Sequence, residues 1–186
     1  MSTIEQNNQT EQTIPTGTWQ ADTVHSRVAF EVPYAVATFT GEVPTFEASL
    51  EDGTLRGVAQ IRSLQVKEEN LEAHLLSPEF FDAERHPEVA FVSHEIRRNG
   101  DAVAIDGEIT IKGITRPATL TGTATGPTVD HFGANRLGLR LTTTVDRTAF
   151  DSNWNMPLPN GDPALSNEVT LKADLTLVAQ GEQTEA

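Results

Sequence analysis

The sequence contains no cysteine, which excludes several classes of protein at once. Disulfide-stabilised folds, thiolate catalysis, zinc–cysteine sites and iron–sulfur clusters all need that side chain. Basic residues are also scarce, with 13 Lys and Arg against 27 Asp and Glu and a net charge of −14. Binding to nucleic acid or to an anionic membrane relies on a basic surface. We therefore expect no nucleic-acid partner, and the acidity favours solubility instead.

The sequence also lacks a long apolar run. No stretch approaches the roughly 20 residues that a membrane-spanning helix needs. Residues 1–16 show neither the basic start nor the apolar core of a secretory signal. These features predict a cytoplasmic protein without a transmembrane segment. Because residues 1–16 and 181–186 are polar and aperiodic, we expect disordered tails on both sides of one domain over residues 17–180.

Alternation of apolar and polar side chains dominates this domain. A period of two places alternate side chains on opposite faces of a strand, and long runs with one wet face are typical of antiparallel sheets. The pattern is clearest in residues 103–111, 137–145 and 169–177, and weaker in 28–34, 46–50, 55–61, 89–93 and 118–124. About eight strands in sequential hairpins predict an all-β closed barrel, because closure removes exposed strand edges.

Turn residues separate these runs. Asp52-Gly53 and Asn99-Gly100 stand where type I′ hairpin turns need positive φ, and Lys112-Gly113 before Thr115 predicts another chain reversal. Two segments break the alternation. Residues 68–76 place leucines at helical spacing before Ser77-Pro78, which predicts a short helix that closes one end of the barrel. Residues 151–167 are long for a hairpin loop and contain three prolines with apolar residues, which is typical of a lid or binding loop.

The strand face expected to point inward carries small as well as large residues. Leu139 and Leu141 lie on it, but so do Gly57 and Gly107. Glycine within a strand marks either a bend or a close approach of a ligand or backbone, so two interpretations stay open: local bending, or a cavity. The aromatic residues, among them Phe39, Phe46 and Trp154, fit either a packed core or a lined cavity.

Motifs of enzyme chemistry are missing. There is no nucleophile elbow, phosphate-binding loop, dinucleotide fingerprint or His-Glu-x-x-His sequence. The five histidines, including His74, show no ligand spacing, so we expect no metal and no cofactor. Arg147 ends an alternating run, and two positions fit it: a surface pair with Asp146 or Asp151, or the barrel mouth, where its planar fork would bind a ligand head group.

Several ordered motifs resemble the YceI-like family over roughly residues 18–179. They are listed here in chain order: His25-Ser26-x-Val28-x-Phe30, Asn70-Leu71-Glu72-Ala73-His74-Leu75, Phe80-Phe81-Asp82, Pro87-Glu88-Val89-Ala90-Phe91-x-Ser93, Gly107-Glu108-Ile109-Thr110-Ile111-x-Gly113-x-Thr115 and Arg147-x-x-Phe150. The resemblance implies an extended, lipocalin-like, eight-stranded antiparallel barrel. It also implies a homodimer that binds a polyisoprenoid, an isoprenoid quinone or a fatty-acyl amphiphile in its lumen without catalysis.

Two departures from the family accompany this resemblance. Many relatives carry a secretion signal and are periplasmic, whereas none is visible in this chain. Asp151 also stands where the family often has glycine, at the start of the long loop.

Together, the patterns and the resemblance select candidate ligand-contacting residues. They are Phe30, Phe39, Phe46, Gly57, His74, Phe80, Phe81, Phe91, Gly107, Leu139, Leu141, Arg147, Phe150, Trp154 and Met156. The expected function is storage, transport or presentation of a long apolar ligand. Two alternatives remain open: an enzyme that uses His74 or Arg147 on a small hydrophobic substrate, and a ligand-free barrel with a filled core that only self-associates or binds a partner.

Overall fold

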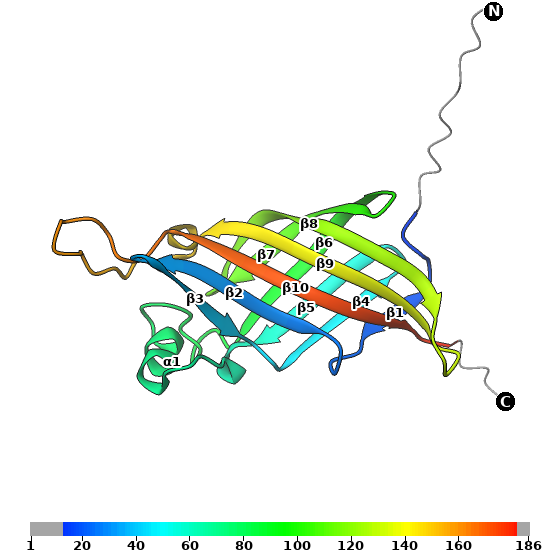
Figure 1. The fold of residues 1–186 in the computed structure, drawn as a ribbon, viewed down its shortest axis with the longest axis horizontal. Coiled ribbons are helices and arrows are strands. Elements are labelled where there is room, and N and C mark those ends of the chain that lie inside the picture. Colours follow the sequence, from blue (N-terminus) through cyan, green and yellow to red (C-terminus); the bar gives the residue numbers. More distant parts are fainter. Residues whose placement is uncertain (1–12, 182–186) are drawn as a thin grey trace, which may run out of the picture.

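The computed structural model describes residues 13–181, which form ten antiparallel strands, one α-helix and two short 3-10 helices (Figure 1). The strands are β1 (Thr18–Ala21), β2 (Arg27–Tyr34), β3 (Ala37–Glu42), β4 (Phe46–Glu51), β5 (Thr54–Gln60), β6 (Glu88–Asn99), β7 (Ala102–Ile111), β8 (Ile114–Val129), β9 (Asn135–Asp146) and β10 (Glu168–Ala179). The helices are η1 (Ile61–Ser63), α1 (Glu69–Leu76) and η2 (Arg147–Phe150). The tails expected at residues 1–16 and 181–186 fall mainly outside the described residues.

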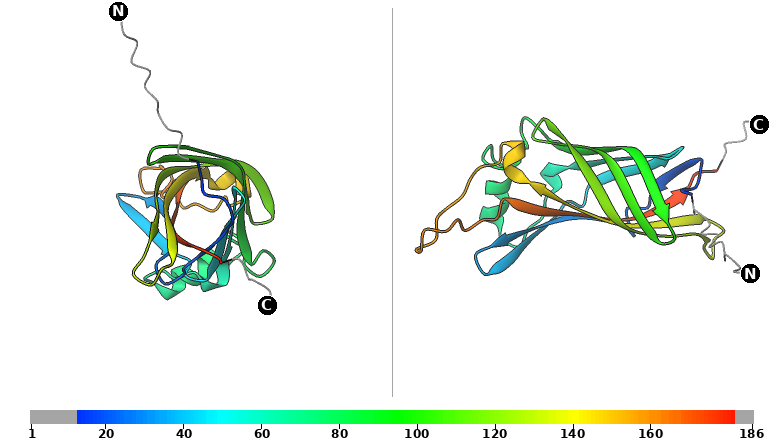
Figure 2. Two further views of the ribbon diagram at one scale, coloured as in Figure 1. Left: turned by 90° about the vertical axis from the view of Figure 1, so that its right-hand side faces the viewer. Right: turned by 90° about the horizontal axis from the view of Figure 1, so that it is seen from above.

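The strands close into a barrel, seen end-on in Figure 2. β4 to β10 follow one another in order, and β1 pairs with both β4 and β10, which gives a closed ring of eight strands. After β1, the chain forms β2, which also pairs with β10, and β3 then pairs with β2. A Glu42–Gln65 bridge and α1 lie beside β3 at this end (Figure 1). The closed antiparallel barrel with one helix predicted from the sequence is confirmed.

The period-two pattern corresponds to the inside and outside of the barrel. In β7 the odd-numbered residues from Val103 to Ile111 are buried, while the even-numbered ones are partly or fully exposed. Two strands escaped the sequence analysis. β1 has four residues with a single buried one, Trp19, and most of β3 is exposed, so neither shows enough alternation to be recognised.

Two of the three predicted turns are confirmed. Asp52 and Gly53 have φ of 46° and 84°, and Lys112 and Gly113 have φ of 53° and 72°. The third prediction was displaced by one residue: Asn99 ends β6 and pairs with Ala102, so the turn consists of residues 100 and 101. Gly100 has a φ of 60°, so the glycine is the residue of this turn that adopts the left-handed conformation.

Helix α1 begins one residue later than predicted. The Glu68 side chain accepts hydrogen bonds from the Asn70 and Leu71 amides and so caps the helix. The helix ends at Leu76, before Ser77-Pro78. Its buried residue, Leu75, joins the main core, which fixes α1 against the end of the barrel beside β3.

The barrel is filled with side chains at the end where the described chain enters and leaves it. Trp19 of β1 lies opposite Ala179 of β10, so both chain ends lie there (Figure 1). Leu50 pairs with Trp19, and Leu137 pairs with Leu177. These residues and Leu139 are almost fully buried in this filled half. The filled half therefore forms a conventional hydrophobic core that needs no guest.

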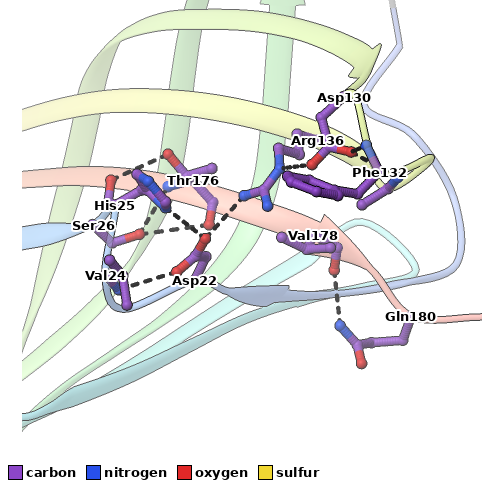
Figure 3. A network of polar contacts seen from close by, with 11 residues as sticks. Asp22, Val24, His25, Ser26, Asp130, Phe132, Arg136, Thr176, Val178 and Gln180 are labelled. Carbon is purple, nitrogen blue, oxygen red and sulfur yellow. Dashed lines mark hydrogen bonds and ion pairs between the residues drawn. The ribbon is translucent and has the colours of Figure 1, made fainter.

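A polar network connects the β1–β2 connection to the β8–β9 hairpin on the outside of this half (Figure 3). Asp22 Oδ2 accepts hydrogen bonds from His25 Nδ1 at 2.7 Å and from an Arg136 terminal nitrogen at 2.9 Å. Arg136 Nε donates to Asp130 at 2.6 Å. The hydrogen bonds from Arg136 and then His25 lower the pKa of Asp22 to about 2.

Replacing Asp22 with asparagine will lower stability in a pH-dependent way. A folded-state pKa below the unfolded value of about 3.9 stabilises the protein above that value, and this contribution disappears as the pH falls toward 2. After screening at the surface, we expect a loss of about 1 kcal/mol at pH 7. Urea unfolding of both proteins from pH 7 to pH 2.5 measures it. A difference that stays constant over this range would contradict the role given to the Asp22 carboxylate.

Candidate functional site

The other half of the barrel holds two adjoining apolar cavities. The outer chamber, of about 330 Å³, lies among α1, the end of β2 and the loop after η2. The inner chamber, of about 140 Å³, continues into the barrel between β2, β4, β5, β6 and β10. Both chambers are lined by Phe30, Phe81, Ile111 and Leu171, so these residues stand where the two spaces meet.

The inner chamber is underfilled by its own side chains. Ala48, Phe91 and Ala173 line it and keep partial exposure although they face the interior. Gly57 lies beside them in the sheet, and a Cβ added there would meet only the Glu47 carbonyl oxygen, at 3.9 Å. Side chains in a packed interior have neighbours at contact distance on all sides. The inner chamber therefore has room for a guest.

An aromatic pair separates the two chambers. The rings of Phe30 and Phe81 lie 5.7 Å apart, edge to face, and Phe39 packs on Phe30 at 6.0 Å. Phe30 also explains a glycine on the neighbouring strand, because a Cβ at Gly41 would lie 2.4 Å from its ring. The junction is thus built from apolar rings that contact each other at the edge-to-face distances that aromatic pairs favour.

Polar groups occur in the outer chamber. Tyr34, His74, Arg147 and Ser152 line it together with apolar residues. His74 Nε2 lies 2.6 Å from Glu79 Oε2, and its ring packs edge-on against Phe80 and Trp154, with centroids 4.8 and 4.7 Å away. His74 therefore connects α1 to the long loop across one side of the chamber.

Arg147 lines the outer chamber and forms no surface pair with Asp146 or Asp151. It is buried, and its side chain donates hydrogen bonds to the carbonyl oxygens of Ser152, Trp154 and Ser166, at 2.7 to 2.9 Å. A further bond goes to Asn167 Oδ1 at 3.2 Å. Burial lowers the pKa of Arg147, partly offset by the nearby Asp146 charge. The guanidinium thus fixes both ends of the 151–167 loop over the chamber, and a surface pair is excluded by its burial.

The 151–167 loop starts with Asp151, which stands where the motif described above often has glycine. Asp151 has φ of 59°, in the left-handed region where glycine is favoured and aspartate is tolerated. The substitution therefore preserves the backbone path. Lys112 Nζ donates to the Asp151 carbonyl oxygen at 2.7 Å and holds the same turn.

The structure brings most of the predicted site residues into the two chambers. Phe30 and Phe81 line both, and the remaining lining residues divide between them: Phe46, Gly57, Phe91 and Leu141 in the inner chamber, and Phe39, His74, Phe80, Arg147, Phe150 and Trp154 in the outer one.

Three predicted site residues lie elsewhere. Gly107 leaves no space, because a Cβ there would lie 2.2 Å from the Val92 carbonyl oxygen and 2.7 Å from the Phe91 ring; it is a close approach of backbone next to the Ser93–Glu95 bulge. Leu139 belongs to the filled half. Met156 is 56% exposed on the projecting part of the long loop.

Other lining residues were missed. Among them are Val28, Val43, Val89 and Leu120 in the inner chamber, and Tyr34, Leu71 and Leu165 in the outer one. The inner residues could have been found, because Val28, Val89 and Leu120 lie within runs whose alternation was recognised. Leu71 and Leu165 carry no such signal, since they reach the chamber through the helix and the long loop.

Residues 13–181 contain no group of three or more His, Cys, Asp or Glu side chains placed to hold a metal ion. Within the same range, no helix has the length and apolarity required to cross a bilayer.

Comparison with known sequences identifies relatives. A family model described as the YceI-like domain matches residues 19–177. A UPF0312 protein of Pseudomonas putida is 35% identical over 78 residues, which is 41% of this chain and 41% of the relative. The chain thus matches about two fifths of the length of that relative. A UPF0312 protein of Staphylococcus aureus is 27% identical over 161 residues, 82% of this chain and 92% of the relative.

Solved structures share the fold at low sequence identity. BcnA of Burkholderia cenocepacia superposes with a TM-score of 0.70 and 19% identity, over 86% of this chain and 99% of that one. A polyisoprenoid-binding domain of Saccharophagus degradans, implicated in plant cell wall breakdown, superposes with a TM-score of 0.68 and 10% identity, over 87% of this chain and 98% of that one. These solved structures share the barrel fold over most of this chain.

Proposed function

Because this chain belongs to the YceI-like family, we propose that it binds one long apolar molecule in the two chambers, without catalysis. The observation that carries the proposal is the underfilled inner chamber, where Gly57 and its neighbours leave room beside apolar walls. The structural neighbour described as a polyisoprenoid-binding domain supports an isoprenoid chain as the ligand class. Isoprenoid quinones and fatty-acyl amphiphiles share the required shape and apolarity.

The distribution of polar groups supports one orientation for such a ligand. The inner chamber is apolar almost throughout, whereas Tyr34, His74 and Ser152 line the outer chamber. A polar head group left in an apolar space loses its hydrogen bonds with water, at a cost of several kcal/mol. The tail therefore passes the Phe30–Phe81 junction into the inner chamber, and the head stays in the outer one.

Apolar burial is sufficient for such binding. At about 0.3 kcal/mol per atom, each five-carbon isoprene unit contributes roughly 1.5 kcal/mol. About six units would then give near-micromolar affinity. Such binding does not need the cluster of polar side chains that is typical of an enzyme site.

The arrangement of His74 favours binding over catalysis. Its Nε2 atom pairs with the Glu79 carboxylate, and the Ser152 hydroxyl is directed at the Glu79 carbonyl oxygen, 3.5 Å away. A nucleophile–base mechanism needs a hydroxyl within hydrogen-bond reach of the imidazole. Storage, transport or presentation of the ligand by a cytoplasmic homodimer completes the proposal.

Native mass spectrometry of the purified protein tests it directly. We expect an added mass that solvent extraction removes and identifies as a long-chain lipid, and we expect the extracted protein to take up an added isoprenoid quinone at one per chain. Repeated recovery of ligand-free protein that also takes up no quinone would contradict the proposal. The same spectra report whether the chain is a dimer.

A further inference from the structure

Two neighbouring segments at the outer-chamber end are almost free of charge. Residues 32–41 contain no Asp, Glu, Lys or Arg, and residues 152–167 contain only Asp162. This is unusual in a chain whose charged fraction is 22% and whose net charge is −14. A surface that must only remain soluble has no reason to avoid charge over so long a stretch.

Backbone pairing joins these segments into one extension, which we call the apolar tip and define as residues 33–37 and 155–166. Tyr34 bridges to Leu165, and the Ala35 amide donates to the Ala164 carbonyl oxygen at 2.8 Å. The Ala164 amide donates in turn to the Met156 carbonyl oxygen at 3.0 Å. The long loop reaches farther from the barrel than any other part of this end (Figures 1 and 2). The tip is therefore ordered by backbone hydrogen bonds, which connect the segments around Ala35, Met156 and Ala164.

The tip exposes large apolar side chains beside the outer chamber. Val36 is fully exposed, Met156 is 56% exposed and Tyr34 is 44% exposed. Tyr34 also lines the outer chamber, so the exposed apolar surface continues into the cavity. Val24 and Phe132, at the opposite end, are exposed as well, at 85% and 94%, but they stand beside Asp22, Asp130 and Arg136 (Figure 3). The exposed apolar residues at the filled end thus have charged neighbours, whereas Asp162 is the one charged residue of the tip.

The geometry points to a lipid bilayer as the partner of the tip: we propose that it docks on a zwitterionic bilayer surface, so that the outer chamber opens toward the membrane. This inference rests on the proposed function, because a long apolar ligand resides in a bilayer and leaves it reluctantly. A proline-stiffened segment with exposed apolar side chains and Asp162 as its one charged residue enters the interface with little charge to desolvate and little loss of conformational freedom. Glu68, Glu69 and Glu72 of the nearby α1 segment would repel an anionic surface.

Vesicle flotation with the full chain tests the docking. We expect the wild-type protein to float with phosphatidylcholine vesicles, and the Val36→Asp/Met156→Asp variant to float at least fivefold less. The Val24→Asp/Phe132→Asp variant, with the same substitutions at the other end, should float like the wild type. Adding phosphatidylglycerol to the vesicles should reduce binding. Equal flotation of the two variants, or stronger binding to anionic vesicles, would overturn the proposal.

Sedimentation without vesicles separates docking from self-association. If Val36→Asp/Met156→Asp changes the oligomeric state, the tip contacts a second copy of this chain and the membrane proposal fails. An unchanged state supports docking.

A transfer assay distinguishes this inference from the function on which it rests. Uptake of an isoprenoid quinone is measured from phosphatidylcholine vesicles and from an ethanol stock. We expect the tip variant to lose uptake from vesicles at least fivefold and to keep uptake from ethanol. If the wild type takes up quinone from neither source, the proposed function fails, whatever the flotation shows. If the tip variant takes up quinone from vesicles as fast as the wild type, the docking proposal fails alone.

Discussion

Replacing Gly57 with leucine will weaken binding of a long apolar ligand at least about tenfold and will leave the barrel folded. The added side chain enters the inner chamber of about 140 Å³, where a Cβ meets no side chain. It displaces roughly five ligand atoms, worth about 1.5 kcal/mol of affinity. Stability should stay unchanged or rise slightly, because the variant removes a glycine from a strand and fills a void. Quinone titration and thermal unfolding of the same preparation measure both effects.

Matched substitutions give this prediction its control. Gly57→Ala adds one methyl group to the same space and should leave binding nearly unchanged. Gly107→Ala should instead lower stability by about 1–3 kcal/mol, because its Cβ would press on the backbone of Val92 and Ser93. If Gly57→Leu unfolds the protein, or binds quinone like the wild type, the inner chamber is not the tail site.

Replacing Arg147 with methionine will lower stability by about 3 kcal/mol and release the 151–167 loop. The guanidinium supplies the hydrogen bonds of three carbonyl oxygens and of Asn167 Oδ1, and a buried acceptor that loses its donor costs about 1–3 kcal/mol before relaxation. Lysine will not restore the loop, since a single ammonium cannot span both ends of the guanidinium fork. Limited proteolysis should cut the variant within the loop at protease levels that spare the wild type.

The exposed Arg140 on β9 provides the control for this variant. Arg140→Met should change stability by less than about 0.5 kcal/mol. If Arg147→Met reduced ligand affinity while the loop stayed resistant to protease and stability stayed the same, Arg147 would be a head-group ligand instead.

The sequence predicted the barrel well because its dominant signal is local. Alternation in β7 and β9 directly records which side chains face inward, and the turn pairs at Asp52 and Lys112 record where strands reverse. β1 escaped because four residues cannot establish a period. Its position depends on long-range pairing with β4 and β10, which no local pattern encodes.

The candidate site was less predictable, and its glycines show why. Gly57 and Gly107 share the same inward parity, yet one faces open space and the other faces a neighbouring backbone. Gly107 pairs with Ser93, beside the register shift between Ser93 and Glu95, and the β6 backbone approaches it closely there. Arg147 illustrates the same limit, because its partners are main-chain carbonyls of a loop whose path the sequence does not reveal.

Both ends of the described chain leave the barrel beside its filled half, opposite the outer chamber. A fluorescent label attached beside Thr18 or Ala179 would therefore lie at the filled end of the barrel, away from the outer chamber. Immobilisation through such a position on a sensor surface would leave the opening directed into solution.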